Sequence, residues 1–366
     1  MNRGRTMPKI VVDARMINAS GIGVYIKNVL HEIFDKNLLQ YEFYLMGNQL
    51  ELKKEFSCYS RVHYIHMTAA IYSIQEQKEM LKKIPSDIDL LWSPHYNIPL
   101  FYKSKLLVTI HDVFHLRKDI NNNSLVKQIY AKALFNFVSK KADKIIAVSD
   151  FTKNEYLSYV NKGDRDKVNV IYNGVDTKWY LNKHQVETKY MVYVGNVKPH
   201  KNLLRLIKAF KSIKDEIPHN LIIIGKRDGF ITPDNTVLEE AEEISDRIRF
   251  TGYLEDNKLR EVVASADFLV YPSLYEGFGL PPLEAMACGC PVLASKAASI
   301  PEVCKDYVEY VDPYDVNDIA NGILNLANND EKKKEMSSRG IAYAKSYTWE
   351  QCAIEVARCM QEVIGK

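Results

Sequence analysis

The chain has 366 residues, of which 46% are hydrophobic and 26% charged, a composition typical of globular proteins with sizeable cores. Its length predicts two domains. The sequence shows no run of about 20 apolar residues that would span a bilayer and no cysteine spacing typical of zinc sites. Residues 1–15 (MNRGRTMPKIVVDAR) lack an apolar h-region, so we expect no secretion by a signal peptide. The formal net charge of +3 conceals an asymmetry, because residues 1–180 carry 26 Lys and Arg against 18 Asp and Glu, whereas the remainder carries 23 against 28.

The cysteines and charges predict the compartment and the partners. Six cysteines without disulfide or metal spacing favour reduced thiols, and hence a cytoplasmic protein. The basic front half would suit an anionic acceptor, or peripheral contact with the inner face of an anionic membrane. Its Lys and Arg residues form no polybasic tract, so we expect no nucleic-acid partner.

Apolar runs of strand length alternate with helical patterns along the whole chain. This alternation predicts parallel sheets covered by helices, and therefore an α/β fold. In the front half the expected strands are residues 9–13, 42–46, 62–65, 89–93, 105–110, 144–148 and 168–172. The expected helices there are residues 23–35, 74–83, 125–141 and 151–160.

The first motif follows the first expected strand, which ends in residues 13–15 (DAR). Residues 18–25 (NASGIGVY) then lead into a helix. Gly21 and Gly23 would permit a positive φ and a close approach of the backbone to a donor phosphate or sugar. The loop lacks the full G-x-G-x-x-G spacing, so a plain βα turn is the alternative.

Two histidines follow expected strands of the front half. The run 106–112 (LLVTIHD) ends in His111 and Asp112, and His95 lies within residues 93–99 (SPHYNIP). Ligands bind beyond the carboxyl ends of strands in open α/β sheets, so His111 is a candidate site residue and His95 could face an acceptor. A structural role is the alternative for each.

A turn at residues 173–176 (NGVD), followed by polar residues, predicts a linker to a second series of elements. The strands expected in that series are residues 190–195, 220–225, 248–250, 267–271 and 291–294. The expected helices are residues 203–214, 237–244, 257–264 and 315–327. Two doubly wound domains are therefore expected.

The first strand of the second series runs into residues 193–202 (YVGNVKPHKN). A glycine turn, then cations, then a helix suits a diphosphate, because backbone N–H groups and the helix start attract an anion and Lys201 adds a point charge. An exposed basic loop is the alternative.

The most specific stretch is residues 267–295, which read as strand, glycine loop, short helix and strand. Pro281 and Pro282 fit the first helical positions, and Gly289 fits the helix stop. Glu276 precedes the loop and Glu284 lies on the helix, so two carboxylates flank an anion site formed by the helix start. This arrangement predicts a nucleotide-sugar site.

Residues 276–295 (EGFGLPPLEAMACGCPVLAS) resemble the signature of glycosyltransferase family 4, a family of retaining enzymes. The resemblance spans nearly the whole chain, from Asp13 to residues 347–349 (YTW). It implies the GT-B fold, in which two Rossmann-like doubly wound domains face a central cleft. Residues 1–180 would form the N-terminal acceptor-side domain, with the C-terminal helix 350–366 crossing back onto it. Residues 187–347 would form the donor-binding domain.

The resemblance also implies roles for the candidate residues. His111, Lys201 and Glu276 would be catalytic: His111 would contact the donor sugar, and Lys201 would stabilise the leaving diphosphate. Glu276 would hold sugar hydroxyls, together with the backbone N–H groups around Phe278, Gly279 and Leu280. Glu284 would hold the ribose.

Other family positions match less closely. Gly21 and Gly23 correspond to the family's opening glycine loop (SGIG-x-Y). Asn196 stands where the family usually has Arg, which leaves Lys201 as the secure phosphate contact. Residues 250–257 (FTGYLEDN) resemble the loop that cradles the base, with Tyr253 and Leu254 against it, although capping of a helix by Asp256 or Asn257 is the alternative.

The resemblance implies a retaining transfer of a hexose from a nucleoside diphosphate sugar to a lipid-linked or surface polysaccharide. No cofactor and no metal are expected, because the Asp-x-Asp triplets at residues 87–89 and 164–166 lack the context of a metal–diphosphate site. Residues 92–100 and 194–202 resemble O-antigen-type mannosyltransferases, which favours mannose from GDP-mannose. The alternatives are a soluble metabolic glycosyltransferase of the sucrose or trehalose type, and a GT-B-fold sugar-nucleotide epimerase.

Overall fold

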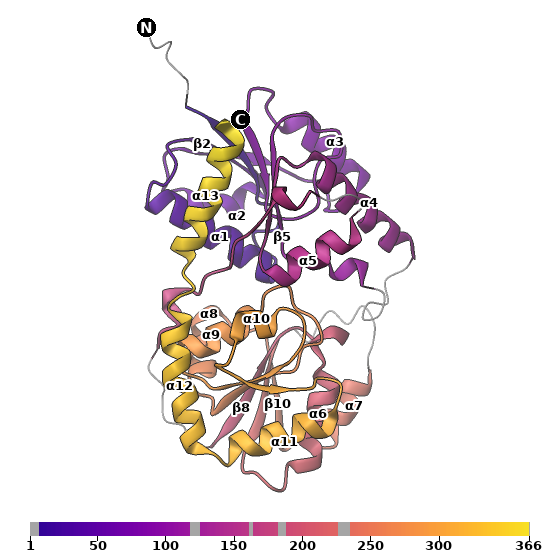
Figure 1. The fold of residues 1–366 in the computed structure, drawn as a ribbon, viewed down its shortest axis with the longest axis vertical. Coiled ribbons are helices and arrows are strands. Elements are labelled where there is room, and N and C mark those ends of the chain that lie inside the picture. The colour runs from indigo at the N-terminus through magenta and orange to yellow at the C-terminus, as the bar shows by residue number, and fades with distance from the viewer. Residues whose placement is uncertain (1–6, 118–124, 161–163, 182–187, 226–234, 366) are drawn as a thin grey trace. The chain divides into compact units, whose positions relative to one another are not determined.

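A computed structural model describes residues 7–117, 125–160, 164–181, 188–225 and 235–365. These residues form two compact units (Figure 1). Among the described residues, the first unit consists of residues 7–116, the segment from residue 125 to Gly174, and the residues from Thr348 onward. The second unit consists of Arg117 and the residues between Val175 and Tyr347.

A sheet of seven parallel strands forms the centre of the first unit, in the order β3-β2-β1-β4-β5-β6-β7. The strands are β1 (Lys9–Asp13), β2 (Glu42–Gly47), β3 (Val62–His66), β4 (Leu90–Ser93), β5 (Leu106–Ile110), β6 (Lys144–Ala147) and β7 (Val168–Val170). β4, β5 and β6 are buried along their whole length, which explains their continuous apolar sequences. The strand order reverses between β1 and β4, so the loops after these two strands flank a topological switch point.

The helices of the first unit are α1 (Ser20–Asp35), α2 (Gln49–Phe56), α3 (Ile74–Lys83), α4 (Leu125–Lys141), α5 (Asp150–Tyr159) and α13 (Trp349–Gly365). Two 3₁₀ turns, Phe114–Leu116 and Arg165–Lys167, lie between them. α13 lies alongside α1 (Figure 1) and buries an apolar stripe that includes Val356, Met360 and Val363. This spacing of three and four residues is that of one helix face.

Six parallel strands form the sheet of the second unit, in the order β10-β9-β8-β11-β12-β13. They are β8 (Tyr190–Val194), β9 (Asn220–Ile224), β10 (Ile248–Gly252), β11 (Phe268–Tyr271), β12 (Val292–Ser295) and β13 (Glu309–Val311). The order reverses between β8 and β11. The loops that carry Lys201 and Glu276 therefore flank the switch point of this sheet.

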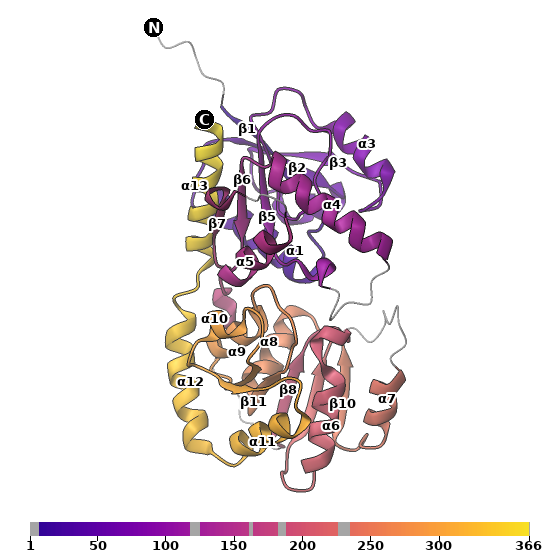
Figure 2. The same cartoon turned by 45° about the vertical axis from the view of Figure 1, so that its right-hand side comes forward.

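The helices of the second unit are α6 (Leu203–Ile213), α7 (Asn235–Glu242), α8 (Asp256–Ser265), α9 (Leu280–Ala287), α10 (Ile300–Cys304), α11 (Val316–Ala327) and α12 (Asp330–Ala344). Two 3₁₀ turns are Thr177–Trp179 and Pro199–Lys201. α6 packs against α11 (Figure 2), and both contribute leucines and isoleucines to the core of this unit.

The predicted α/β fold with two parallel sheets is confirmed, and the expected strands and helices are present with ends displaced by a few residues. Four elements were not expected from the sequence: α2, α10, α12 and β13. α12 buries only Lys333, Gly340 and Ala344, so its sequence has little apolar periodicity. β13 has three residues, which is too short for a strand pattern to be recognised.

Candidate functional site

The loops after β8 and β11 are held together by hydrogen bonds. The backbone N–H of Leu274 donates to the carbonyl of His200 at 2.7 Å. The buried Asn202 side chain donates to the carbonyl of Pro272 at 2.9 Å, from a left-handed backbone position with φ of 61°. These bonds fix the Lys201 loop against the Glu276 loop at the switch point of the second unit.

Lys201, Tyr271 and Glu276 form a compact cluster between the two loops. The Lys201 ammonium donates to Glu276 Oε1 at 2.6 Å and lies 3.2 Å from the Tyr271 hydroxyl oxygen. The Tyr271 hydroxyl donates to the same Oε1 atom at 2.8 Å. Tyr271 is fully buried at the end of β11, whereas the side chains of Lys201 and Glu276 are 18% and 13% exposed. A ligand can therefore reach the cation and the carboxylate.

The electrostatics keep Glu276 ionised and His200 neutral. Burial opposes ionisation of Glu276, but the Lys201 ammonium and the Tyr271 hydrogen bond outweigh it and hold the pKa of Glu276 below its ordinary value. Burial, together with the neighbouring Lys201, lowers the pKa of His200 to about 4. His200 therefore adds no positive charge to this loop at neutral pH.

The Glu276 loop leads into α9 through a left-handed residue. Gly279 has a φ of 101°, and a Cβ there would lie 2.6 Å from Ile300 Cδ1. The Ser299 hydroxyl lies 2.9 Å from the carbonyl oxygens of both Glu276 and Phe278, within hydrogen-bonding distance of each, and so holds the loop in place. No side chain caps the start of α9 at Gly279 and Leu280, and prolines occupy its first turn as predicted, so the positive helix end faces the loop.

Glu284 lies one turn into α9 and titrates in an unusual range. Burial, with the nearby carboxylates of Asp256 and Asp176, raises the pKa of Glu284 to about 7. A hydrogen bond from Trp179 and the charge of Arg260 oppose this rise. The side chain remains partly exposed, so it can accept hydrogen bonds from a ligand once it is ionised.

The remaining candidates of the second unit lie on loops that follow parallel strands. Asn196 is partly buried and follows Gly195, whose N–H donates to the carbonyl of Ile224. Tyr253 is 66% exposed and Leu254 partly buried, between β10 and α8.

The helix-capping alternative for this last loop is wrong. The N-cap of α8 is Glu255, which makes no side-chain capping bond, and Asn257 instead accepts a hydrogen bond from Arg260 at 2.6 Å.

His111 lies in the first unit, directly after β5. Its Nε2 donates to the carbonyl of Pro94 at 2.9 Å, and its ring packs edge-on against Tyr25 with centroids 4.9 Å apart. Burial lowers the pKa of His111 to about 4, so the ring is neutral at neutral pH. The side chain is oriented by the protein and is suited to hydrogen bonding rather than to carrying charge.

The two glycines of the opening loop belong to the first turn of α1, and the expected positive φ is wrong for both. Gly23 is required for close packing, because a Cβ there would lie 2.3 Å from the carbonyl oxygen of Ile17. Gly21 is exposed, with open space around it. No side chain caps α1 at Ala19, so its first N–H groups remain available as donors.

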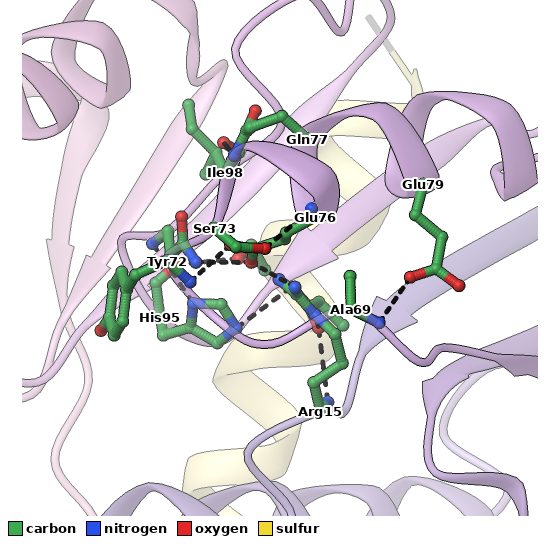
Figure 3. Close-up of polar contacts among 12 residues, drawn as sticks. Arg15, Ala69, Tyr72, Ser73, Glu76, Gln77, Glu79, His95 and Ile98 are labelled. Carbon is green, nitrogen blue, oxygen red and sulfur yellow. Dashed lines mark hydrogen bonds and ion pairs between the residues drawn. The ribbon is translucent and has the colours of Figure 1, made fainter.

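His95 is buried rather than exposed to a ligand. It is 2% exposed, and its Nε2 lies 3.1 Å from Asp13 in a cluster that also contains Arg15 and Glu76 (Figure 3).

The two Asp-x-Asp triplets have partners within the protein. Lys9 pairs with Asp87 and its N–H donates to Asp89 at 2.8 Å, and Asp164 caps the turn at Arg165–Lys167. Across the described parts of the chain, no three His, Cys, Asp or Glu residues are grouped to hold a metal ion.

Sequence reasoning missed Tyr271 and the partners of Arg15. Tyr271 ends an apolar strand and therefore looked like a core residue, although a tyrosine directly before the loop at Pro272 is a detectable signal of a hydroxyl aimed at that loop. Arg15 meets Glu76 across 61 residues of sequence, and no local pattern encodes this pairing.

Two family models match the chain. The model described as Glycosyltransferase Family 4 matches residues 51–179, and the model described as Glycosyl transferases group 1 matches residues 181–343. O-antigen chain mannosyltransferase RfbU of Salmonella typhimurium is 30% identical over 274 residues, which cover 75% of this chain and 73% of that protein. O-antigen chain mannosyltransferase B of Escherichia coli is 34% identical over 230 residues, covering 58% of this chain and 59% of that protein.

Solved structures share the fold. Sucrose-phosphate synthase from Thermosynechococcus elongatus superposes with a TM-score of 0.80 at 17% identity, over 98% of this chain and 100% of that one. Anabaena HepE in complex with UDP-glucose superposes with a TM-score of 0.77 at 18% identity, over 98% and 100%. At these identities the likeness establishes the architecture, and the predicted GT-B fold is confirmed.

Proposed function

Because the chain belongs to the group 1, family 4 glycosyltransferases, a retaining family, we propose that it transfers mannose from GDP-mannose to a lipid-linked or surface polysaccharide. The observation that carries the donor site is the Lys201–Tyr271–Glu276 cluster beside the uncapped start of α9. The choice of mannose is supported by the two relatives named as O-antigen chain mannosyltransferases.

In this proposal the second unit holds the donor. The Lys201 ammonium and the positive end of α9 stabilise the charge that develops on the leaving diphosphate. The ionised Glu276, with the backbone N–H groups around Phe278, Gly279 and Leu280, holds the sugar hydroxyls, and Glu284 holds the ribose. The hydrogen bonds from sugar hydroxyls to the ionised Glu276 are bonds to a charged group, each worth about 1.5–3 kcal/mol.

The other assignments are proposed on the family resemblance. His111 contacts the donor sugar, with Gly21 and Gly23 at the start of α1 beside the donor. Asn196 lies at the diphosphate, and Tyr253 and Leu254 lie at the base. The acceptor attacks on the face from which the diphosphate departs, which gives retention of configuration.

A panel of nucleotide sugars tests the donor directly. A ligand that binds only the folded protein stabilises it by about 2.7 kcal/mol at a concentration of 100 Kd. We expect GDP-mannose to raise the melting temperature more than UDP-glucose, UDP-galactose or GDP-fucose at equal concentration. A larger rise with a UDP sugar would contradict the proposed donor but not the proposed site.

We also propose that the first unit contacts an anionic membrane at its cytoplasmic face, where a lipid-linked acceptor would be presented. No helix in the described ranges is long and apolar enough to cross a bilayer. The support is the charge balance of residues 1–180, with 26 basic against 18 acidic residues. Flotation with vesicles of phosphatidylglycerol should recover the protein, and vesicles of phosphatidylcholine should not; equal recovery would contradict the electrostatic contact.

A further inference from the structure

The first unit carries a buried ionic network at its topological switch point. Asp13 ends β1, and His95 follows β4, and these are the two strands between which the strand order reverses. Open α/β sheets ordinarily bind ligands at such a point. Here protein groups occupy it: the side chains of Asp13 and Glu76 are fully buried, and those of Arg15 and His95 are 4% and 1% exposed (Figure 3).

Arg15 joins the two buried carboxylates. Its Nε and Nη2 donate to the two oxygens of Asp13 at 2.7 and 2.5 Å, and its Nη1 donates to Glu76. The other lone pairs of Glu76 accept from Asn97 Nδ2 at 2.6 Å and from the N–H of Tyr72 at 2.6 Å. Buried carboxylates are tolerated only when their oxygens are hydrogen-bonded in this way, and these bonds restrict the arrangements that the network can adopt.

This Arg15 network (Asp13, Arg15, Glu76, His95 and Asn97) fixes the loop that follows β4. His95 Nδ1 accepts from the N–H of Asn97 at 3.2 Å, so the ring proton is on Nε2, which lies 3.1 Å from Asp13. The Ser93 hydroxyl donates to the carbonyl of His95 at 2.8 Å. The backbone on both sides of Pro94 is therefore tied to buried groups.

Pro94 is the link between this loop and His111. Its carbonyl accepts from His111 Nε2 at 2.9 Å. A ring nitrogen that donates must carry the proton, so the carbonyl sets the tautomer of the His111 ring and also its direction. The opposite nitrogen, Nδ1, is then an acceptor suited to a hydroxyl of a sugar.

We propose that the Arg15 network is a positioning device for His111, which acts by holding the carbonyl of Pro94. Its members are positioning residues: they are buried and do not touch the substrate. The inference rests on the role proposed above for His111 at the donor sugar. Misplacing a catalytic group by about 1 Å can cost a hundredfold in rate, so a network that holds one carbonyl in place has kinetic consequences.

The first experiment compares Glu76→Gln with Glu79→Gln. The two glutamates lie one turn apart on α3, and both accept hydrogen bonds from backbone N–H groups. The hydrogen bonds of Glu79 go to Thr68, Ala69 and Lys83 rather than to the Arg15 network (Figure 3). The readout is the ¹⁵N shift of the His111 ring in protein labelled on histidine, assigned by its loss in His111→Ala.

In the wild-type protein and in Glu79→Gln, we expect the His111 ring to be protonated on Nε2 alone. In Glu76→Gln we expect a mixture of Nε2 and Nδ1 tautomers. Ser93→Ala, which removes only one hydroxyl beside Pro94, should give the same mixture without the loss of a buried charge. A His111 ring that stays protonated on Nε2 alone in both Glu76→Gln and Ser93→Ala would overturn the proposal.

The second experiment measures transfer from GDP-mannose in a double-mutant cycle. Glu76→Gln should lower kcat by about tenfold to a hundredfold with little change in KM, whereas Glu79→Gln should stay within about twofold of wild type. In the His111→Ala background, Glu76→Gln should change kcat by less than about twofold, because both changes act through one ring.

Equal effects on kcat in both backgrounds would contradict the proposal, whereas wild-type turnover in His111→Ala would instead contradict the proposed role of His111. If GDP-mannose supports no transfer at all, the proposed donor fails and the ¹⁵N readout alone decides on the network.

Discussion

At the scale of single residues, the geometry of the proposed donor site depends on the side chain of Tyr271. Tyr271 reaches both Lys201 and Glu276, and its ring lies under the ammonium with the nitrogen 5.5 Å from the centroid. It thereby sets the distance between the cation proposed to bind the diphosphate and the carboxylate proposed to bind the sugar. Without the hydroxyl, the Lys201–Glu276 ion pair loses its third partner and the pKa of Glu276 rises toward its ordinary value.

We therefore predict that Tyr271→Phe lowers kcat/KM by about tenfold to a hundredfold, the value of one hydrogen bond to a charged group. The acid limb of the pH profile of kcat/KM should also move to higher pH, because Glu276 must be ionised to accept sugar hydroxyls. Tyr190→Phe is the control: its hydroxyl donates to the carbonyl of Val262, away from these loops. A pH profile that is unchanged in Tyr271→Phe would show that the hydroxyl does not act on Glu276.

Glu284 gives a second prediction at this scale. Its pKa is raised to about 7, so below pH 7 it is protonated and a poorer acceptor for ribose hydroxyls. Donor affinity should rise as pH increases through about 7 and then level off. Isothermal titration calorimetry between pH 6 and pH 8 measures this affinity, and Glu284→Gln should bind the donor weakly with no such rise.

The same raised pKa means that ionising Glu284 costs folding stability as pH rises from 4.5 toward 7.

At the scale of the elements, the first turn of α1 offers a matched pair of substitutions. A Cβ at Gly23 would collide with the backbone carbonyl of Ile17, which cannot move aside, whereas a Cβ at Gly21 meets nothing within 4 Å. Gly21→Ala should therefore stabilise the protein by up to about 1 kcal/mol through helix propensity. Gly23→Ala should destabilise it by about 1–3 kcal/mol. Urea unfolding compares the two; a lower midpoint for Gly21→Ala would contradict the local geometry.

How much of the fold could be predicted depended on the period of the apolar residues. β5, with five buried residues, was recognisable as a strand, and α6 buries six residues at helical spacing, so it was recognisable as a helix. α12 was missed because it packs against α9 through few buried residues, among them Gly340 and Ala344, and because the ion pair of Lys333 with Asp267 leaves no apolar pattern. Sequence patterns report amphipathic faces and do not report ion pairs between distant segments.

The residues of the candidate site were likewise predictable where they lie close together in sequence, and not where they come from distant segments. The loops with Lys201 and Glu276 were found because glycines, prolines and charges lie close together in sequence. The Arg15 network was missed because its members come from three separate segments and meet only when the sheet forms. The positive φ expected at Gly23 was wrong because the sequence shows that a glycine is present but not which backbone atom lies over it.

At the scale of the whole molecule, each unit contains an aspartate whose ionisation stabilises the fold. Asp13 pairs with Arg15 in the first unit, and Asp267 accepts from His219 at 2.9 Å and pairs with Lys333 in the second. Burial opposes ionisation of both, but these partners outweigh it and hold both pKa values below the ordinary 3.8. A lowered folded-state pKa gives stability that is complete above the unfolded value and is lost as pH falls through the folded one.

Acid should therefore destabilise both units, with a loss of roughly 2 kcal/mol from each aspartate below about pH 4. Asp267→Asn should reduce stability at pH 7 and flatten the acid dependence of the second unit. The control is Asp215→Asn, whose side chain is 84% exposed and pairs with its neighbour Lys214. Thermal melts between pH 2.5 and pH 7 test this, and an Asp267→Asn melt that is as acid-sensitive as wild type would contradict it.

The central claim is that a nucleoside diphosphate is held at the switch point of the second unit by the Lys201 ammonium. The most direct test is turnover of GDP-mannose by Lys201→Met, with the melting temperature measured on the same sample. A folded protein with kcat reduced by about a hundredfold or more is the predicted result, since this is the effect of losing one charge stabiliser of a leaving group. A folded variant that turns over at the wild-type rate would show that the diphosphate is bound elsewhere.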